Sequence, residues 1–306
     1  MMIGLWLLFF GRLYSAQTML VEPHLRRVSG KLHESTMPSI DFIYLINLDR
    51  RPEKYKKSIN ALAPYGIVPH RFSAVNGWEL SSRALDELGV FYEIGTPEGP
   101  LSTVFRREGG AEFSSFEIMK EPNVSYYCHS FTRGAIGCIL SHLSILQDAF
   151  ESNYNVIWIM EDDIRVVEDP HRLSSLTLEL SQIAPDWDIL FTDDEIKGAD
   201  GGQVYCGGIL PRPLVTLQPF SYYEQRVDVH PDMIRLGLRY GSHSMIISRA
   251  GIAKILTYFK KNKLFFPYDM EYCCIPDIQM YACKYDIVTN IAGGPSDLGT
   301  PSYENQ

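Results

Sequence analysis

Three consecutive carboxylates have the clearest chemical meaning in this sequence. Glu161, Asp162 and Asp163 directly follow the apolar residues 156–160, and residues 161–169 hold five acids and only one base. Clustered carboxylates repel one another and need a cation or a proton to offset their charge. In an extended strand Glu161 and Asp163 share one face, and two carboxylates on one face are suitable ligands for Mg²⁺ or Mn²⁺. The pattern therefore predicts a divalent-metal site that can also meet substrate phosphates.

Two further apolar runs end in polar residues that could join this site. One leads into Asn47, Asp49 and Arg50, and the other, at residues 187–191, leads into an acidic stretch that includes Asp193. Ligands of open α/β sheets bind beyond the carboxyl ends of the strands, so the three ends are expected to meet at one crevice. A single acidic strand end would be ordinary, because every strand must end in something polar. Three such ends together favour a functional site.

The charge of the chain limits what kind of partner the site can serve. The 306 residues carry 28 Lys and Arg against 37 Asp and Glu, a formal net charge of −9. This surplus of acids argues against nucleic acid as a partner, because phosphate backbones bind to basic surfaces. A phosphate-bearing ligand would therefore need a cation. Residues 50–57 do hold five Lys or Arg beside one Glu, and a metal site that faces this basic corner could hold a diphosphate.

Alternating strands and helices are predicted to position these residues. Short apolar runs without alternation indicate strands buried on both faces. Apolar residues at helical spacing after Thr132, the predicted N-cap, indicate a long helix. The alternation predicts a layered α/β domain with a mostly parallel central sheet. The predicted strands are 42–46, 68–74, 156–160, 187–191 and 244–248, and the predicted helices are 51–63, 132–150, 171–183 and 250–259.

Two regions stand apart from this pattern. The chain begins with ten residues, MMIGLWLLFF, that are apolar apart from one glycine, whereas a membrane-spanning helix needs about 20. Residues 1–38 are therefore predicted to be a signal-like or membrane-dipping segment with a linker, unless the start is misassigned, which leaves export and peripheral membrane association at the cytoplasmic face both open. Residues 39–306 are predicted to form a single domain, with an irregular insertion at about 78–130 where glycine and proline recur.

Several motifs, taken in order, resemble those of the family 25 glycosyltransferases. That family includes lipopolysaccharide, lipooligosaccharide and collagen galactosyltransferases. The likeness covers roughly residues 41 to 290, and its specificity comes from the order and spacing of the motifs. The three main motifs are INLDRR at 46–51, GAIGCILSH at 134–142 and IMEDD at 159–163, and later blocks of the family are similar to YGSHS at 240–244 and PYD at 267–269.

The resemblance implies a fold, a reaction and a set of ligands. It implies a GT-A-type, Rossmann-like fold, a UDP-sugar donor that is usually UDP-galactose, inversion at the sugar carbon, and a divalent metal, Mn²⁺ rather than Mg²⁺. The acceptor would be a glycan or a lipid-linked glycan such as lipopolysaccharide. Carried over onto this chain, the metal ligands are Glu161, Asp163 and His243, and the donor-binding residues are Asn47, Asp49, Arg50, Asn76, Gly77, Ser141, His142 and Asp162.

The transfer also needs a carboxylate that takes the proton of the attacking hydroxyl. Asp269 is the first candidate and Asp193 the second, although either could instead cap a helix or a turn. The chain departs from the family at Asp193, because the family's third strand usually ends in small or apolar residues. Residues 78–130 also match no family block, so the acceptor is the least defined part of the prediction.

The sequence is also compatible with two other functions. The chain could be a decayed transferase that only binds a glycan or a nucleotide sugar, although the intact run of Glu161, Asp162 and Asp163 argues against this. It could also be a metal-dependent nucleotidyltransferase or phosphohydrolase, which would cleave a UDP-sugar without any sugar acceptor.

Overall fold

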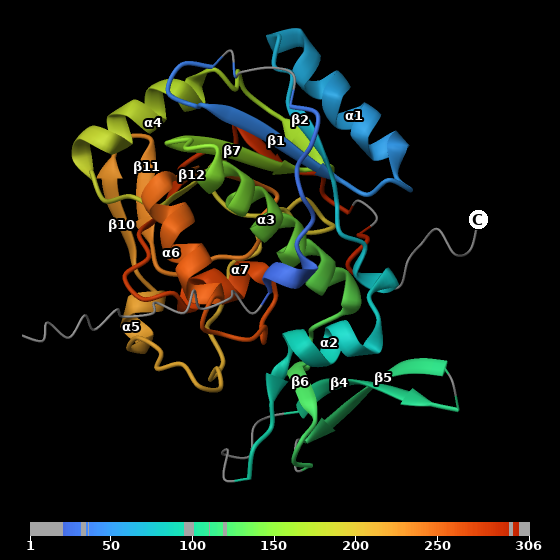
Figure 1. Cartoon of the computed structure of the whole chain (residues 1–306). Coiled ribbons are helices and arrows are strands. Elements are labelled where there is room, and N and C mark those ends of the chain that lie inside the picture. The colour runs from blue at the N-terminus through green and yellow to red at the C-terminus, as the bar shows by residue number, and fades with distance from the viewer. Residues whose placement is uncertain are drawn as a thin grey trace, which may run out of the picture.

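An eight-stranded mixed sheet forms the centre of the computed structural model (Figure 1), which describes residues 21–31, 35, 37–94, 101–109, 111–118, 121–293 and 296–299. The strand order is β10-β11-β13-β9-β12-β7-β1-β2. Six strands run in one direction, as predicted, but β11 and β12 run against them, so the pairing is mixed. The strands are β1 (Phe42–Asn47), β2 (His70–Ser73), β7 (Val156–Glu161), β9 (Ile189–Phe191), β10 (Arg226–His230), β11 (Met233–Leu236), β12 (Ser244–Ser248) and β13 (Met280–Cys283).

Helices cover both faces of this sheet, which explains why its strands lack alternation. In β1, Tyr44 packs into the core on the side of α3 and α6, whereas its neighbour Leu45 packs into the core on the side of α1 and α4 (Figure 1). The long helix α3 begins after its predicted N-cap, since Thr132 Oγ1 accepts a hydrogen bond from Ala135 N at 3.2 Å. The helices are α1 (Pro52–Leu62), α3 (Arg133–Glu151), α4 (Arg172–Ile183) and α6 (Arg249–Phe259). The predicted strands and helices are thus confirmed to within two residues at each end.

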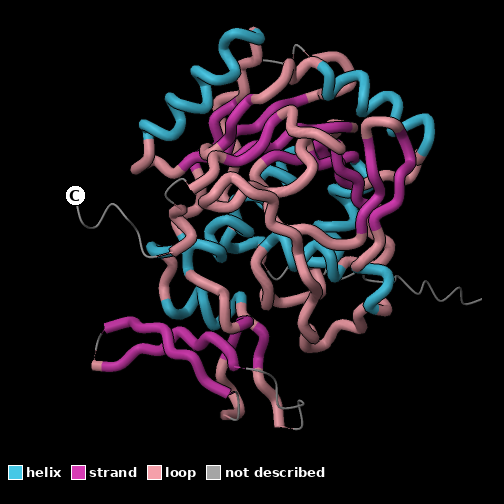
Figure 2. Tube along the Cα trace, turned by 180° about the vertical axis from the view of Figure 1, so that it is seen from behind, coloured by secondary structure: helices cyan, strands magenta, loops and turns pink. Residues whose placement is uncertain are grey.

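The prediction of an irregular insertion at 78–130 was wrong. The region contains the helix α2 (Ser82–Leu88) and a second sheet of order β3-β6-β4-β5, whose β4–β5 hairpin projects from the body of the molecule (Figures 1 and 2). The strands β4 and β5 are partly exposed, which weakens the alternation of apolar and polar residues that would reveal them in the sequence. The strands are β3 (Val90–Phe91), β4 (Leu101–Glu108), β5 (Ala111–Ile118) and β6 (Ser125–Cys128).

The predicted N-terminal segment is only partly described. Its apolar start, residues 1–20, lies outside the described residues. The following part is not a free linker, because Lys31 Nζ lies 2.9 Å from the carboxylate of Asp148 and the backbone N–H of Arg26 donates to Ser144 Oγ at 2.9 Å. Within the described ranges, no helix combines the length and the apolar character needed to cross a membrane.

Gly77 allows the turn after β2 to lie directly on α3. A Cβ added to Gly77 would lie 1.7 Å from the carbonyl oxygen of Arg133. Gly77→Ala is therefore expected to lower the free energy of unfolding by about 1–3 kcal/mol, measured by chemical denaturation. Gly207→Ala is the matched control, because a Cβ there meets nothing within 4 Å. Equal losses in the two variants would contradict the close packing at Gly77.

Candidate functional site

The polar ends of the strands converge at one edge of the sheet. Asn47 and Glu161 are the last residues of β1 and β7, which run in parallel. Because β12 runs antiparallel to β7, its first residue, Ser244, pairs with Met160 at the same edge. The acidic residues that follow Met160 therefore meet the segment that leads into β12, as the backbone N–H of Glu161 donates to the carbonyl of His243 at 2.8 Å.

Two adjoining cavities lie at this edge and share the acidic residues. Both are lined by Glu161 and Asp163, together with Cys138 and Leu298. The first cavity is further lined by residues from β1, from the turn after β2, from α3 and from the end of β7, including Asn47, Asn76, Gly77, Ser141 and Asp162. The second cavity is further lined by residues before β12 and around the short helix α7 (Tyr268–Glu271), including Gly241, Ser242, His243, Tyr268 and Asp269. The acidic residues thus stand between two binding spaces.

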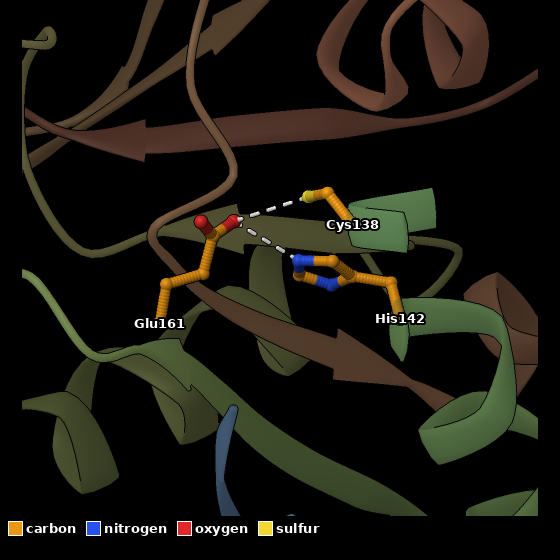
Figure 3. A group of neighbouring side chains, drawn as sticks. All are labelled: Cys138, His142 and Glu161. Carbon is orange, nitrogen blue, oxygen red and sulfur yellow. Dashed lines mark hydrogen bonds and ion pairs between the residues drawn. The ribbon is translucent and has the colours of Figure 1, made fainter. Parts of the chain in front are cut away.

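One oxygen of Glu161 is held by three side chains, and Figure 3 shows two of them, His142 and Cys138. Its Oε1 lies 3.0 Å from Nε2 of the buried His142, accepts a hydrogen bond from Ser242 Oγ at 2.7 Å and lies 3.8 Å from Cys138 Sγ. Burial raises the pKa of Glu161, but the hydrogen bonds to His142 and Ser242 outweigh it and hold the pKa well below its usual range. Glu161 is therefore an oriented anion whose Oε2 makes no hydrogen bond to the described residues.

Asp163 carries an unsatisfied carboxylate oxygen in the site. Its Oδ1 is buried and has no hydrogen-bond partner among the described residues. Burial, and after it the negative charge of Glu161, raise the pKa of Asp163. Buried carboxylate oxygens normally have partners, and two adjacent carboxylates are stabilised by a cation. Glu161 and Asp163 therefore fit a divalent metal.

A second set of potential ligand atoms is formed by Cys138, His142 and Glu161, which lie within 4.8 Å of one another (Figure 3). Burial raises the pKa of the Cys138 thiol well above its usual value. The Cys138 side chain is thus a neutral thiol at physiological pH, and a thiol is a poor ligand for Mn²⁺ or Mg²⁺. These contacts are better suited to orienting Glu161.

Asp162 and Asn47 both line the first cavity and are joined by a hydrogen bond. The Asn47 side chain donates to Asp162 Oδ2 at 2.7 Å, and its own oxygen accepts from Arg71 Nε at 2.9 Å. Burial raises the pKa of Asp162 to about 7, although Asn47 and Lys54 act against the shift. Asp162 and Asn47 thus form a polar wall that can accept hydrogen bonds from a ligand.

The other predicted donor-binding residues divide into two groups. Asn76, Gly77 and Ser141 line the first cavity, and Ser141 Oγ accepts the N–H of Val75 at 2.9 Å, which ties α3 to the turn after β2. His142 lies behind Glu161 and is not one of the described residues that line the cavity.

Asp49 and Arg50 do not join the other predicted donor-binding residues. Asp49 pairs with Arg71 at 2.8 Å and Arg50 pairs with Glu79 at 2.8 Å. Neither belongs to the described lining of the first cavity. Their contacts are consistent with support of the strand ends.

Asp193 is fully buried in a polar network. Its Oδ1 lies 3.0 Å from Arg239 Nη2, and its Oδ2 lies 2.9 Å from His243 Nε2 and accepts from Thr289 Oγ1 at 2.8 Å. Burial raises its pKa, but Arg239 and His243 outweigh this and hold the pKa well below the usual range. It is not among the described residues that line either cavity. Asp193 is therefore placed to orient His243, and it is a poor candidate for the base.

His243 lines the second cavity with one ring nitrogen engaged. Burial lowers its pKa, but the carboxylate of Asp193 outweighs burial and raises the pKa overall. Because Nε2 faces Asp193, Nδ1 is the nitrogen that remains for a ligand, and it can coordinate a metal when the ring is neutral.

Asp269 has the surroundings expected of a proton acceptor. It lies in the first turn of α7, lines the second cavity and accepts the N–H of Gly241 at 2.9 Å. Burial, and to a lesser extent the charge of Glu161, raise its pKa. A carboxylate with a raised pKa binds a proton more readily than an ordinary one, which suits general base catalysis near neutral pH.

The structure brings to the site several residues that sequence reasoning did not single out, among them Ser242, Cys138, Asp297 and Leu298. Ser242 lies within the YGSHS block and Cys138 within the motif at 134–142, so the motifs contained a signal for both. Asp297 and Leu298 line the first cavity from a segment whose sequence carries no motif.

Comparison with known proteins identifies relatives of this chain. A sequence model of the family described as glycosyltransferase family 25 (LPS biosynthesis protein) matches residues 40–271. A glycosyltransferase 25 family member of Drosophila pseudoobscura pseudoobscura is 30% identical over 152 residues, 50% of this chain and 20% of the relative. Procollagen galactosyltransferase 1-A of Xenopus laevis is 26% identical over 186 residues, 60% of this chain and 26% of the relative. The inactive glycosyltransferase 25 family member 3 of Mus musculus is 25% identical over 174 residues, 56% of this chain and 24% of the relative. The chain thus spans a fifth to about a quarter of the length of these curated relatives.

Proposed function

Because this chain belongs to glycosyltransferase family 25, we propose that it transfers a hexose, galactose in the first place, from a UDP-sugar to a hydroxyl group of a glycan. The acceptor would be a free or lipid-linked glycan, such as a lipopolysaccharide. The proposed reaction is inverting. The acceptor oxygen attacks the sugar carbon from the face opposite the diphosphate, the bond to the diphosphate breaks, and UDP leaves.

The first cavity is the proposed donor site. Asp162 is placed to accept hydrogen bonds from the ribose hydroxyls, and Asn47 keeps it in position at 2.7 Å. The turn at Asn76 and Gly77 brings backbone into the cavity wall, close to α3, where a base or ribose can contact it.

Glu161 and Asp163 would hold a divalent cation, Mn²⁺ rather than Mg²⁺ in our proposal, which when bound neutralises the negative charge developing on the leaving diphosphate. His142 and Ser242 orient Glu161 through Oε1, so that Oε2 keeps its capacity as an acceptor. His243 is held by Asp193 and offers Nδ1 from the second cavity as a third contact.

The second cavity is the proposed acceptor site. Asp269 would take the proton of the attacking hydroxyl, and its hydrogen bond from Gly241 N keeps the carboxylate in place. The two cavities adjoin at the acidic residues, so a donor in one and an acceptor in the other would meet there. Holding both reactants in one geometry supplies a large part of the rate enhancement of such a transfer.

The observation that carries this proposal is the acidic pair shared by two adjoining cavities, with a buried oxygen of Asp163 left without a described partner. The test measures UDP release from UDP-galactose, UDP-glucose and UDP-N-acetylglucosamine, with and without Mn²⁺ and a glycan acceptor. We expect release from UDP-galactose that needs Mn²⁺ and increases with the acceptor.

Two other results would each identify a rival function. Release at the same rate with and without an acceptor would identify a hydrolase. No release from any donor would favour a binding protein on an inactive scaffold; the mouse relative is itself named an inactive family member.

A further inference from the structure

A C-terminal segment, residues 296–299, lies along the first cavity, and we call it the strap. Ser296, Asp297 and Leu298 belong to the cavity lining. The strap rests on the start of α3, because Thr132 Oγ1 donates to the carbonyl of Leu298. A Cβ added to Gly134 would lie 2.6 Å from the carbonyl oxygens of Asp297 and Leu298, so the two segments are in close contact.

The strap brings a carboxylate to two cations of the basic corner. Asp297 forms ion pairs with Arg51 and, at 2.5 Å, with Lys54. Lys54 Nζ also lies 4.0 Å from Asp162 Oδ1, so this group of charges adjoins the polar wall of the first cavity. The side chains of Arg51, Lys54 and Asp297 are only 10%, 12% and 13% exposed.

Cations with so little access to water need an anion nearby, because water no longer stabilises their charge. In this structure Asp297 is such an anion for Arg51 and Lys54. A diphosphate in the first cavity would bring the same kind of charge to Lys54, which lines the cavity, and to Arg51, which shares Asp297 with Lys54. Glu53 and Asp162 already lie near these cations, so a diphosphate that binds beside Asp297 adds to the repulsion among the anions, and the departure of Asp297 relieves it.

We propose that Arg51 and Lys54 form an anion site for the diphosphate of the donor, and that Asp297 occupies this site as an intramolecular competitor. The donor displaces Asp297, and the strap moves off the cations as the diphosphate takes its place. This inference rests on the proposed function, since it concerns the site to which the UDP-sugar is assigned.

The loss of UDP affinity caused by Asp297 depends on the fraction of molecules in which the strap occupies the anion site. The apparent dissociation constant equals the intrinsic one divided by the fraction of molecules whose site is open. If the strap covers the cations in about nine-tenths of the molecules, its carboxylate weakens UDP binding about tenfold. Asp297→Asn removes the charge and keeps the shape, so it should tighten UDP binding by about three- to tenfold.

The experiment titrates UDP, in the presence of Mn²⁺, and separately inorganic pyrophosphate, into the full chain by calorimetry. Glu53→Gln is the matched control. Glu53 Oε1 lies 2.6 Å from Arg51 Nε, but the Glu53 side chain is 62% exposed and is not part of the described cavity lining. The control removes a negative charge beside Arg51 without opening the cavity, so its affinity should change less than twofold. Asp297→Ser is the second variant if the asparagine variant folds poorly, as judged by its melting temperature.

Tighter UDP binding in Asp297→Asn, without the same gain in Glu53→Gln, supports the competition. Unchanged or weaker UDP binding in Asp297→Asn overturns the competition. Asp297 would then have no effect on UDP binding or would contribute to it. If neither the wild type nor any variant binds UDP, the proposed function fails. The competition by Asp297 is then judged from the pyrophosphate affinities alone. A gain in pyrophosphate affinity supports the anion site under Asp297, and no gain overturns it.

Discussion

Replacing Asp163 by asparagine is expected to abolish metal-dependent UDP binding and to lower the turnover number kcat by at least about a hundredfold. Asp163 Oδ1 is buried without a described partner, and its neighbour Glu161 carries a negative charge. Asparagine keeps the shape of the side chain but removes the charge that a cation needs. Calorimetric titration of UDP with and without Mn²⁺ measures the first effect, and UDP release measures the second.

The same substitution should not weaken the fold. Because burial and Glu161 raise the pKa of Asp163, its charged form opposes folding when no cation is bound. The destabilisation is absent below the ordinary pKa of an aspartate and grows as pH rises through the raised pKa. At neutral pH and without metal, the melting temperature of Asp163→Asn should thus equal or exceed that of the wild type. Asp169→Asn, at an exposed acid of the same stretch, is the control. Unchanged Mn²⁺-dependent binding in Asp163→Asn would refute the metal assignment.

Asp269→Asn is expected to lower kcat by about 10²- to 10⁴-fold while UDP affinity changes less than about twofold. The carboxylate lies in the second cavity, so its loss removes the proton acceptor and leaves the donor site intact. The base works only when it is ionised. Since burial and Glu161 raise the pKa of Asp269, kcat of the wild type should fall as pH decreases through that raised pKa. The residual activity of the variant should lack this dependence.

Asp193→Asn distinguishes the two candidate bases. Asp193 is paired with Arg239 in the interior, and breaking a buried ion pair costs about 3–5 kcal/mol of stability. Its main effect should therefore appear as a lower melting temperature, whereas Asp269→Asn should melt close to the wild type. A stable but inactive Asp193→Asn together with an active Asp269→Asn would reverse the assignment.

The strand ends were predictable because burial on both faces leaves a clear pattern. In β7, apolar residues face helices on both sides, so the change from Met160 to Glu161 marks the edge of the sheet. The convergence of Asn47 with Glu161 then follows from parallel pairing of their strands. A local pattern together with one rule of sheet geometry was sufficient for this half of the site.

The remaining features depend on contacts between distant residues. The burial of Asp193 depends on Arg239, 46 residues away, and a run of acids does not reveal that partner. The contact of Asp297 with Arg51 joins residues 246 apart. The second sheet was missed because the strands of its projecting hairpin are partly exposed, and Phe116 there is 60% exposed. For Asp193 and Asp297 the determining interaction has no trace in the local sequence.

The position of β12 has a consequence for how the chain is made. β1, β2 and β7 precede it in the sequence and can pair as soon as they emerge from the ribosome, but the other edge of β7 receives its partner only with Ser244–Ser248. Until then this edge presents unpaired backbone groups along an apolar strand, which is a template for pairing with another chain. Interruption of synthesis before Ser244 therefore leaves an aggregation-prone edge, whereas loss of residues 296–299 leaves the partner of every strand in the central sheet in place.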